Sequence, residues 1–348
     1  MKSKDRVEAA MRAYNLHGVS DLRLENADMP VPKDNETLVQ VKAAGICGSD
    51  IPRIFVNGTY HFPTIPGHEF AGIVDSVGSD KDRSWVGKHV GVFPLIPCRK
   101  CEQCKEKRYE MCAHYDYVGS RRDGGFAEYV AVPVWNLVPL SEDIPFTSAA
   151  MLEPLAVALH AVKIAGVKEG QSVGVIGTGM IGICAAQWAK SFGASKVDVV
   201  GRSEEKRNLV EQAELHYEIM TEPSDTVQYD VVIEAVGSPK SIDTAIQSVI
   251  PGGTLLLMGN PSGNIELSQN TYWRILRKQL VLKGTWNSSY DGQASSDWTE
   301  VVAALSEHKI KVEHLISHCF SQEELIDGLN LKYHHQLPYC KVMTTWNS

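Results

Sequence analysis

The sequence predicts an α/β protein of two domains, the second built on a doubly wound parallel sheet. The chain has 348 residues, enough for two domains of ordinary size. Short apolar stretches punctuated by Gly and Pro run to about residue 139, which is typical of an all-β unit. From about residue 157 onward, strand-like and helix-like segments alternate, and this alternation indicates a parallel sheet with crossover helices.

The first part of the chain is predicted to contain strands joined by long loops. The clearest strand candidates are residues 11–16, 38–42 and 127–132. Met11 and the residues after it resemble a natural start, so residues 1–10 are expected to be an extension of unknown role. A helical stretch near 298–306 and a strand at 339–343 are expected to return the chain to the first domain.

The second domain is predicted to begin with an apolar strand and to repeat a strand–helix pattern. Its strands are expected at 172–176, 196–200, 230–235, 254–258 and 280–282, with a helix through 187–190. The predicted boundaries are therefore 156–287 for this domain, and 11–155 together with 288–348 for the other.

A glycine-rich turn, Gly177-Thr178-Gly179-Met180-Ile181-Gly182, lies between the first of these strands and the helix that follows. Its spacing is that of a dinucleotide-binding turn. Gly177 permits the tight turn, Gly179 allows the backbone to approach the pyrophosphate, and Gly182 allows close packing of helix on strand. The first helical residues, Met180 and Ile181, would then meet the phosphates. An ordinary turn without a ligand is the alternative.

The residues after the next strand bear on which nicotinamide cofactor binds. An acidic residue there would hold the ribose 2′-hydroxyl of NAD, but the sequence has Gly201-Arg202-Ser203. Without the carboxylate, a 2′-phosphate is not repelled, and Arg202 and Ser203 can donate hydrogen bonds to it. NADP is therefore favoured over NAD, unless Arg202 is simply a solvated surface charge.

Four of the eight cysteines lie within one fifteen-residue window, in the pattern C-x2-C-x2-C-x7-C. They are Cys98, Cys101, Cys104 and Cys112. Four thiolates close a tetrahedral zinc shell with no position left for substrate, so this site is predicted to be structural. A redox disulfide pair is the competing interpretation.

A second set of metal-binding residue types is dispersed along the chain. It comprises Cys47, the pair His68-Glu69, and Glu153 before a proline. One thiolate, one imidazole and one carboxylate would form an open, catalytic zinc site. Taken singly, a buried Cys or His more often belongs to a hydrophobic core than to a metal site. The spacing of these residues along the chain does not by itself show that they lie together.

Taken in order, these motifs resemble the medium-chain, zinc-dependent dehydrogenase family from Met11 to the end of the chain. Gly67-His68-Glu69-x-x-Gly72 resembles its zinc signature. Cys47-Gly48-Ser49-Asp50 and Glu153-Pro154 resemble the sorbitol and polyol-phosphate branch, and residues 45–58 and 119–129 resemble members that act on galactitol 1-phosphate. The resemblance implies a GroES-like β domain interrupted by a Rossmann domain, and a homodimer or homotetramer formed partly through the Rossmann sheet edge.

The resemblance also implies an activity, hydride transfer between the secondary hydroxyl of a polyol and a nicotinamide. Cys47, His68 and Glu153 are expected to hold the catalytic Zn²⁺, which makes one catalytic and one structural zinc per chain. Ser49 is the candidate first proton acceptor and Asp50 the group that orients His68. Glu69 is expected either to exchange onto the metal or to remain beside it.

One departure affects the proton route, because Pro52 stands where several relatives carry a histidine. The route is then expected to pass through Ser49 and water, or through His61. If the substrate carries a phosphate, the candidate guanidinium groups are those of Arg53, Arg121 and Arg122. The resemblance also places Trp286 and Asn287 among the residues that shape substrate selection.

Alternatives within the same scaffold are an L-threonine 3-dehydrogenase and a general zinc alcohol dehydrogenase. A non-catalytic dinucleotide-binding protein is less favoured, because all the candidate metal ligands are present.

Composition excludes several classes of partner. The net charge is −8 and no basic stripe is present, so nucleic-acid binding is not expected. No apolar run is long enough to span a membrane, and the first residues lack a signal-peptide pattern. A cytoplasmic enzyme with a small-molecule substrate is expected.

Overall fold

The computed structural model describes residues 10–219, 228–292 and 295–346, and contacts divide the chain into two units. The described residues of unit 1 fall within Met1–Glu153, Tyr290–Ser306 and Ile316–Ser348, and those of unit 2 within Pro154–Ser289 and Glu307–Leu315. This division differs from the predicted one chiefly at 307–315, which group with unit 2. Of the predicted extension, only Ala10 is described, as the first residue of β1.

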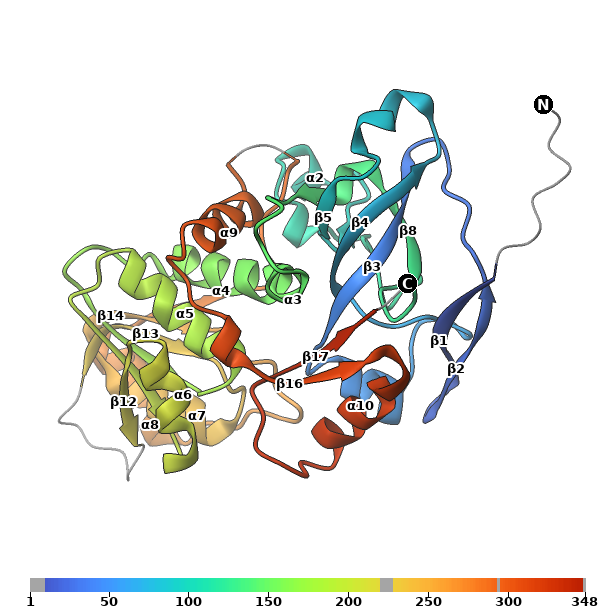
Figure 1. The fold of residues 1–348 in the computed structure, drawn as a ribbon. Coiled ribbons are helices and arrows are strands. Elements are labelled where there is room, and N and C mark those ends of the chain that lie inside the picture. The colour runs from blue at the N-terminus through green and yellow to red at the C-terminus, as the bar shows by residue number, and fades with distance from the viewer. Residues whose placement is uncertain (1–9, 220–227, 293–294, 347–348) are drawn as a thin grey trace, which may run out of the picture. The chain divides into compact units, whose positions relative to one another are not determined.

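Unit 1 is built around a mostly antiparallel sheet with the order β16-β17-β3-β4-β5-β9, in which β8 also pairs with β3 (Figure 1). Its strands are β3 (Glu36–Ile46), β4 (Glu69–Val77), β5 (His89–Val92), β8 (Tyr129–Pro133), β9 (Leu137–Pro139), β16 (Ile316–Ser321) and β17 (Lys341–Thr345). Two separate pairs are β1 (Ala10–Gly18) with β2 (Asp21–Asp28), and β6 (Leu95–Ile96) with β7 (Asp116–Tyr117). The unit's helices are α1 (Asp50–Pro52), α2 (Glu102–Lys105), α3 (Phe146–Ala149), α9 (Asp297–Ser306) and α10 (Leu325–Tyr333).

The core of unit 1 lies between this sheet and the strands and helices that cover it. Val41 and Ile46 from β3, Phe70 from β4 and Trp346 near the C-terminus are fully or almost fully buried in one apolar cluster. Because β17 pairs with β3, the end of the chain is held beside the strand that leads to Cys47.

Unit 2 is a six-stranded parallel sheet with the order β12-β11-β10-β13-β14-β15. Its strands are β10 (Ser172–Ile176), β11 (Lys196–Gly201), β12 (His216–Ile219), β13 (Tyr229–Glu234), β14 (Val249–Leu257) and β15 (Val281–Gly284). Its helices are α4 (Leu152–Ala165), α5 (Met180–Ser191), α6 (Arg207–Gln212), α7 (Pro239–Ser248) and α8 (Gln269–Lys278), with the first two residues of α4 in unit 1. The predicted doubly wound sheet is confirmed. Strand order reverses between β10 and β13, and nucleotides bind at such a switch point.

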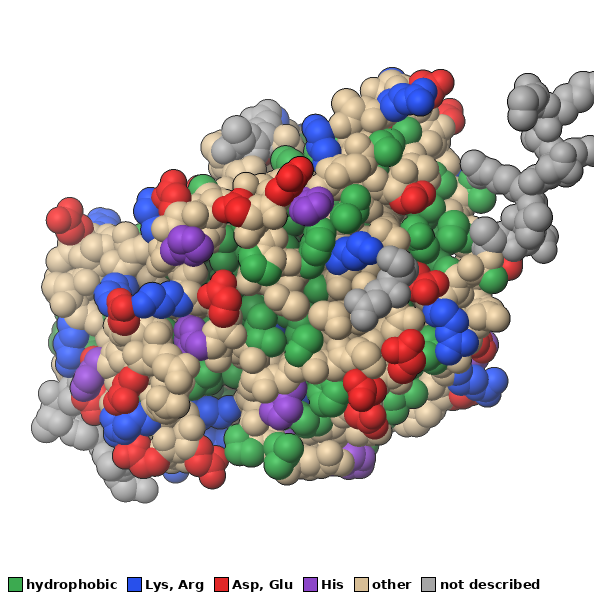
Figure 2. Space-filling model, viewed as in Figure 1, with side chains coloured by type: hydrophobic (Ala, Val, Ile, Leu, Met, Phe, Trp, Pro, Cys, Tyr) green, Lys and Arg blue, Asp and Glu red, His purple; other side chains and the backbone are tan. Residues whose placement is uncertain are grey.

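Two observations describe the surface and the helices. Among the described residues, no helix is both long enough and apolar enough to cross a membrane. Figure 2 shows acidic and basic side chains interspersed over the visible face, without a continuous basic stripe.

Candidate active site

The β3–β4 pair brings together three potential metal donors. Cys47 directly follows β3, Glu69 is the first residue of β4, and the register of the pair sets Gly45 opposite Glu69. One ligand atom each from Cys47, His68 and Glu69 lies within 4.8 Å of the others. A Cβ at residue 45 would lie 2.5 Å from Glu69 Oε2, so Gly45 leaves room for the carboxylate. A thiolate, an imidazole and a carboxylate form the donor set of an open zinc site.

Glu153, the expected third ligand, does not belong to this group, and Glu69 takes its place among the described residues. Glu153 lies partly buried at the start of α4, where its Oε1 accepts a hydrogen bond of 3.5 Å from Tyr117 Oη. Burial raises the pKa of Glu153 to about 7, with His68 opposing and Glu69 adding to this effect. The register of β3 and β4 directs Glu69 to the donors, which sequence spacing does not reveal.

Two buried lysines beside this group were not indicated by any motif. Lys341, the first residue of β17, forms an ion pair with Glu69, and both side chains are less than 5% exposed. Burial alone would lower the pKa of Lys341, but the neighbouring Glu69 and Cys47 raise it. Lys332 in α10 donates a 2.7 Å hydrogen bond to the carbonyl of Ile46, and burial lowers its pKa. In the sequence, the one indication of a special role for Lys341 is its position in the apolar stretch 339–343.

Asp50 lies behind two of the donors. Its Oδ2 accepts the Cys47 N–H at 2.9 Å, and its Oδ1 lies 3.5 Å from His68 Nδ1. The same Oδ1 accepts a 3.0 Å hydrogen bond from Arg53 Nη1. Burial alone would raise the pKa of Asp50, but His68 and Arg53 hold it below its ordinary value. A carboxylate at Nδ1 leaves Nε2 of His68 as the donor atom for a metal.

The two candidate proton carriers have different surroundings. Ser49 is partly exposed, and its Oγ donates a 3.3 Å hydrogen bond to Cys47 Sγ. His61 instead lies with Nδ1 3.0 Å from the Pro63 carbonyl and Nε2 3.1 Å from the Arg121 carbonyl. Ser49 therefore contacts a metal donor directly, whereas both nitrogens of His61 face backbone carbonyls.

The four-cysteine lobe converges on a single point. The Sγ atoms of Cys98 and Cys104 are 3.9 Å apart, as are those of Cys101 and Cys112. A disulfide would need about 2.05 Å, whereas thiolates bound at 2.3 Å in a zinc tetrahedron lie about 3.8 Å apart. Backbone N–H groups also point at the sulfurs, with Cys98 N–H donating to Cys112 Sγ at 3.3 Å. The lobe therefore fits a structural zinc ion.

The glycine-rich turn has the backbone that a dinucleotide site requires. Gly177 has φ of +124°, a conformation that favours glycine. A Cβ on Gly182 would lie 2.3 Å from the Gly177 carbonyl oxygen. Gly179 directly precedes α5, so Met180 and Ile181 lie in the first turn of α5. The unpaired N–H groups of that turn can receive phosphate oxygens.

Tyr217 of β12 occupies the space that a side chain at position 201, the last residue of β11, would take. A Cβ on Gly201 would lie 2.2 Å from Tyr217 Oη, which itself donates a 2.6 Å hydrogen bond to the Ser203 carbonyl. The side chains of Arg202 and Ser203 are exposed. This end of β11 therefore presents a cation and a hydroxyl where NAD-binding domains present a carboxylate.

The predicted substrate arginines differ in their partners. Arg53 is paired with Asp50, and Arg122 with the buried Glu36 at 2.7 Å. Arg121 lies between two tyrosine rings.

Trp286 and Asn287 follow β15 in unit 2, whereas the metal donors belong to unit 1. The indole of Trp286 is 60% exposed, and Asn287 has a positive φ of 55°. Their part in substrate selection remains a prediction.

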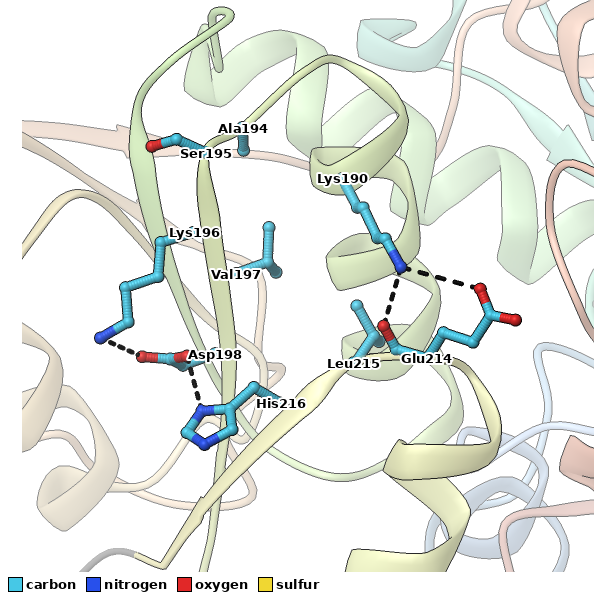
Figure 3. Close-up of a pocket in the computed structure, with 9 residues that line it drawn as sticks. All are labelled: Lys190, Ala194, Ser195, Lys196, Val197, Asp198, Glu214, Leu215 and His216. Atoms are coloured by element: carbon cyan, nitrogen blue, oxygen red, sulfur yellow. Dashed lines mark hydrogen bonds and ion pairs between the residues drawn. The ribbon is translucent and has the colours of Figure 1, made fainter.

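A separate open pocket of about 460 Å³ lies in unit 2 (Figure 3). Lys196 and His216, the first residues of β11 and β12, line it, so it is at the opposite end of the sheet from the glycine-rich turn. The carboxylate of its buried Asp198 lies 2.9 Å from His216 Nδ1 and 2.8 Å from Lys196 Nζ. It also accepts a 2.7 Å hydrogen bond from Tyr229 Oη. These partners satisfy the carboxylate without a ligand.

Two family models match the chain. Residues 33–142 match the model described as alcohol dehydrogenase GroES-like domain, and residues 181–307 match the one described as zinc-binding dehydrogenase. The first covers most of the sheet of unit 1 and the cysteine lobe, and the second covers α5 to β15.

The chain is also similar to characterised proteins. Galactitol 1-phosphate 5-dehydrogenase of Escherichia coli strain K12 is 35% identical over 309 residues, covering 86% of this chain and 89% of the relative. L-galactonate-5-dehydrogenase of the same strain is 29% identical over 312 residues, covering 86% and 88%.

Similar solved structures span nearly the whole chain. Galactitol-1-phosphate dehydrogenase of Escherichia coli superposes with a TM-score of 0.88 at 32% identity, covering 96% of this chain and all of that one. A zinc-binding dehydrogenase of Sinorhizobium meliloti 1021 bound to NADP gives 0.86 at 28% identity, with coverage of 97% and 99%. An alcohol dehydrogenase of Escherichia coli CFT073 with NADH gives 0.87 at 28%, with the same coverage.

Proposed function

Since the chain belongs to the zinc-dependent medium-chain dehydrogenase family, we propose that it transfers a hydride between the secondary hydroxyl of a polyol or polyol phosphate and a nicotinamide cofactor. The observation that carries the proposal is the convergence of Cys47, His68 and Glu69 within 4.8 Å, with the partly buried Glu153 close enough to interact electrostatically with His68 and Glu69. Substrates named for the relatives, galactitol 1-phosphate and L-galactonate, support a polyol-like molecule.

The residues around the donors divide the work of the reaction. Zn²⁺ bound there would lower the pKa of a substrate hydroxyl and so favour the alkoxide. Asp50 orients His68 and holds the Cys47 amide. Lys341 balances the charge of Glu69. Ser49 would take the hydroxyl proton and pass it to water, and its hydrogen bond to Cys47 Sγ and its partial exposure support this role.

The cofactor we propose is NADP in preference to NAD. Support comes from Gly201, where Tyr217 occupies the space of an acidic side chain, and from the exposed Arg202 and Ser203. Solved relatives carry NADP in one case and NADH in another, so the choice depends on these residues. Arg202→Ala should raise KM for NADP⁺ roughly tenfold or more, and leave KM for NAD⁺ nearly unchanged.

The assembly we propose is a homodimer formed through β15, in a cytoplasmic location. β15 ends the described sheet, and Val281 and Leu282 on it are 46% and 42% exposed. The neighbouring α8 exposes Tyr272 and Leu276. Antiparallel pairing of two such edges would continue the sheet across a twofold axis. Eight free cysteines favour a reducing compartment.

The direct test is steady-state oxidation of galactitol 1-phosphate, galactitol, sorbitol, L-galactonate and L-threonine, each with NAD⁺ and NADP⁺. We expect turnover of a polyol or polyol phosphate with NADP⁺ preferred. Turnover of L-threonine alone would refute the polyol assignment, and a clear preference for NAD⁺ would refute the cofactor assignment.

A further inference from the structure

Arg121 is held in a fixed orientation by two aromatic rings. Its guanidinium lies 4.5 Å from the ring centre of Tyr60 and 4.2 Å from that of Tyr115. Nη1 donates to the Tyr115 carbonyl, and Nη2 donates a 3.2 Å hydrogen bond to Tyr60 Oη. Since a guanidinium carries five N–H donors, donors remain for a ligand. The two rings and the two hydrogen bonds therefore hold the group in place without consuming its capacity to bind.

The charge of Arg121 is also left without a counterion. Arg53 and Arg122 form ion pairs with Asp50 and Glu36, but no carboxylate of the described residues lies within ion-pair distance of Arg121. Its side chain is partly exposed. A guanidinium that is oriented, unpaired and accessible is suited to a phosphate, whose oxygens accept two parallel hydrogen bonds.

The position of Arg121 relates it to the metal donors within the same unit. The rings of Tyr115 and Tyr117 pack edge to face with their centres 6.0 Å apart, and the rings of Tyr117 and His68 do so with their centres 5.7 Å apart. A continuous series of contacts, through Tyr115 and Tyr117, therefore links Arg121 to His68 within unit 1.

From these observations we propose that Arg121 binds the phosphate of a substrate, and that the substrate is a hexitol phosphate oxidised at a secondary hydroxyl remote from the phosphate. This inference rests on the proposed function and specifies its substrate class. It also selects one of the three arginines in the active-site loops, because the other two are already neutralised by carboxylates.

The test compares wild type with Arg121→Met, which keeps an apolar side chain between the rings, and with Arg121→Lys. Arg83→Met is the matched control, since Arg83 is a highly exposed arginine of the same unit. With galactitol 1-phosphate, Arg121→Met should raise KM roughly 10- to 100-fold, while KM for galactitol stays unchanged. Arg121→Lys should recover part of the loss, and Arg83→Met should behave as wild type.

A binding measurement complements the kinetics. Inorganic phosphate should inhibit wild type competitively against galactitol 1-phosphate and raise its melting temperature, and both effects should weaken in Arg121→Met. Equal changes of KM for galactitol and its phosphate, or a preference of wild type for L-galactonate or unphosphorylated galactitol, would overturn the inference while leaving the dehydrogenase assignment intact. Absence of turnover with any polyol would refute both.

Discussion

The ion pair of Lys341 and Glu69 places two opposite charges in the interior of unit 1, with both side chains less than 5% exposed. Lys341→Met would leave the Glu69 carboxylate buried without its cation, and breaking such a pair typically destabilises a protein by about 3–5 kcal/mol. We expect the free energy of unfolding of the metal-free protein, measured in urea, to fall by this amount.

The double variant Lys341→Met/Glu69→Gln separates charge from packing. Because it removes both charges, it should recover a large part of the stability lost in Lys341→Met. If the two variants are equally unstable, the lysine stabilises the protein through its aliphatic chain and the charge argument fails.

The pair of Arg122 and Glu36 predicts a pH dependence of stability. Burial alone would raise the pKa of Glu36, but hydrogen bonds from Arg122 and the Lys33 amide hold it below the ordinary value. Because the pKa of Glu36 is lower in the folded than in the unfolded protein, its ionised carboxylate stabilises the folded state at pH values above the unfolded-state pKa. This contribution is lost as the pH falls through the folded-state pKa. Arg122→Met should therefore lower the free energy of unfolding by about 1–3 kcal/mol near pH 7, and by less in acid.

Unfolding in urea at several pH values measures this effect, with Arg83→Met as the control. Arg83 and Asp80 form an exposed ion pair of 3.9 Å. Its loss in Arg83→Met should therefore change the free energy of unfolding little at any pH. A loss of stability in Arg122→Met that is constant with pH would mean that Arg122 acts through packing.

At the scale of elements, the cysteine lobe around α2 and the junction of β3 and β4 are expected to bind zinc independently. Wild type should contain about two zinc ions per chain, and Cys47→Ser and Cys101→Ser about one each, because each removes a ligand from one site. Metal analysis by mass spectrometry measures this content. Cys319→Ser is the control, since this exposed cysteine of β16 lies outside both clusters.

The two cysteine variants should differ in their other properties. Cys47→Ser should abolish turnover while sparing cofactor binding, whereas Cys101→Ser should chiefly lower thermal stability, because a structural metal holds the lobe folded. Two zinc ions retained in Cys101→Ser would exclude the four-cysteine site.

At the scale of the whole molecule, the exposed edge of unit 2 predicts association of two chains. Leu282→Lys places a charge on β15, where it should oppose pairing of two edges. Sedimentation equilibrium should show a dimer for wild type and a shift toward monomer for this variant. Leu337→Lys, at a leucine that is 56% exposed in unit 1, is the control and should remain dimeric. A wild-type monomer would refute the assembly.

The sequence by itself determined the features that depend on local spacing. Five of the six strands of the parallel sheet overlap their predicted ranges, because apolar runs bounded by Gly and polar residues mark buried strands. The missing one, β12, has four residues and begins with an exposed histidine, which weakens the pattern. The cysteine lobe and the glycine-rich turn were also evident, since their residues are neighbours along the chain.

Only the tertiary structure decided which dispersed groups meet. The pairing of β3 with β4 sets Glu69 beside Cys47, and the pairing of β17 with β3 brings in Lys341 from the end of the chain. Likewise, Arg121 and Arg122 are adjacent in sequence, yet Arg122 pairs with Glu36 and Arg121 contacts the rings of Tyr60 and Tyr115. Strand register and long-range contacts set these partners, and neither is encoded in the spacing of any single motif.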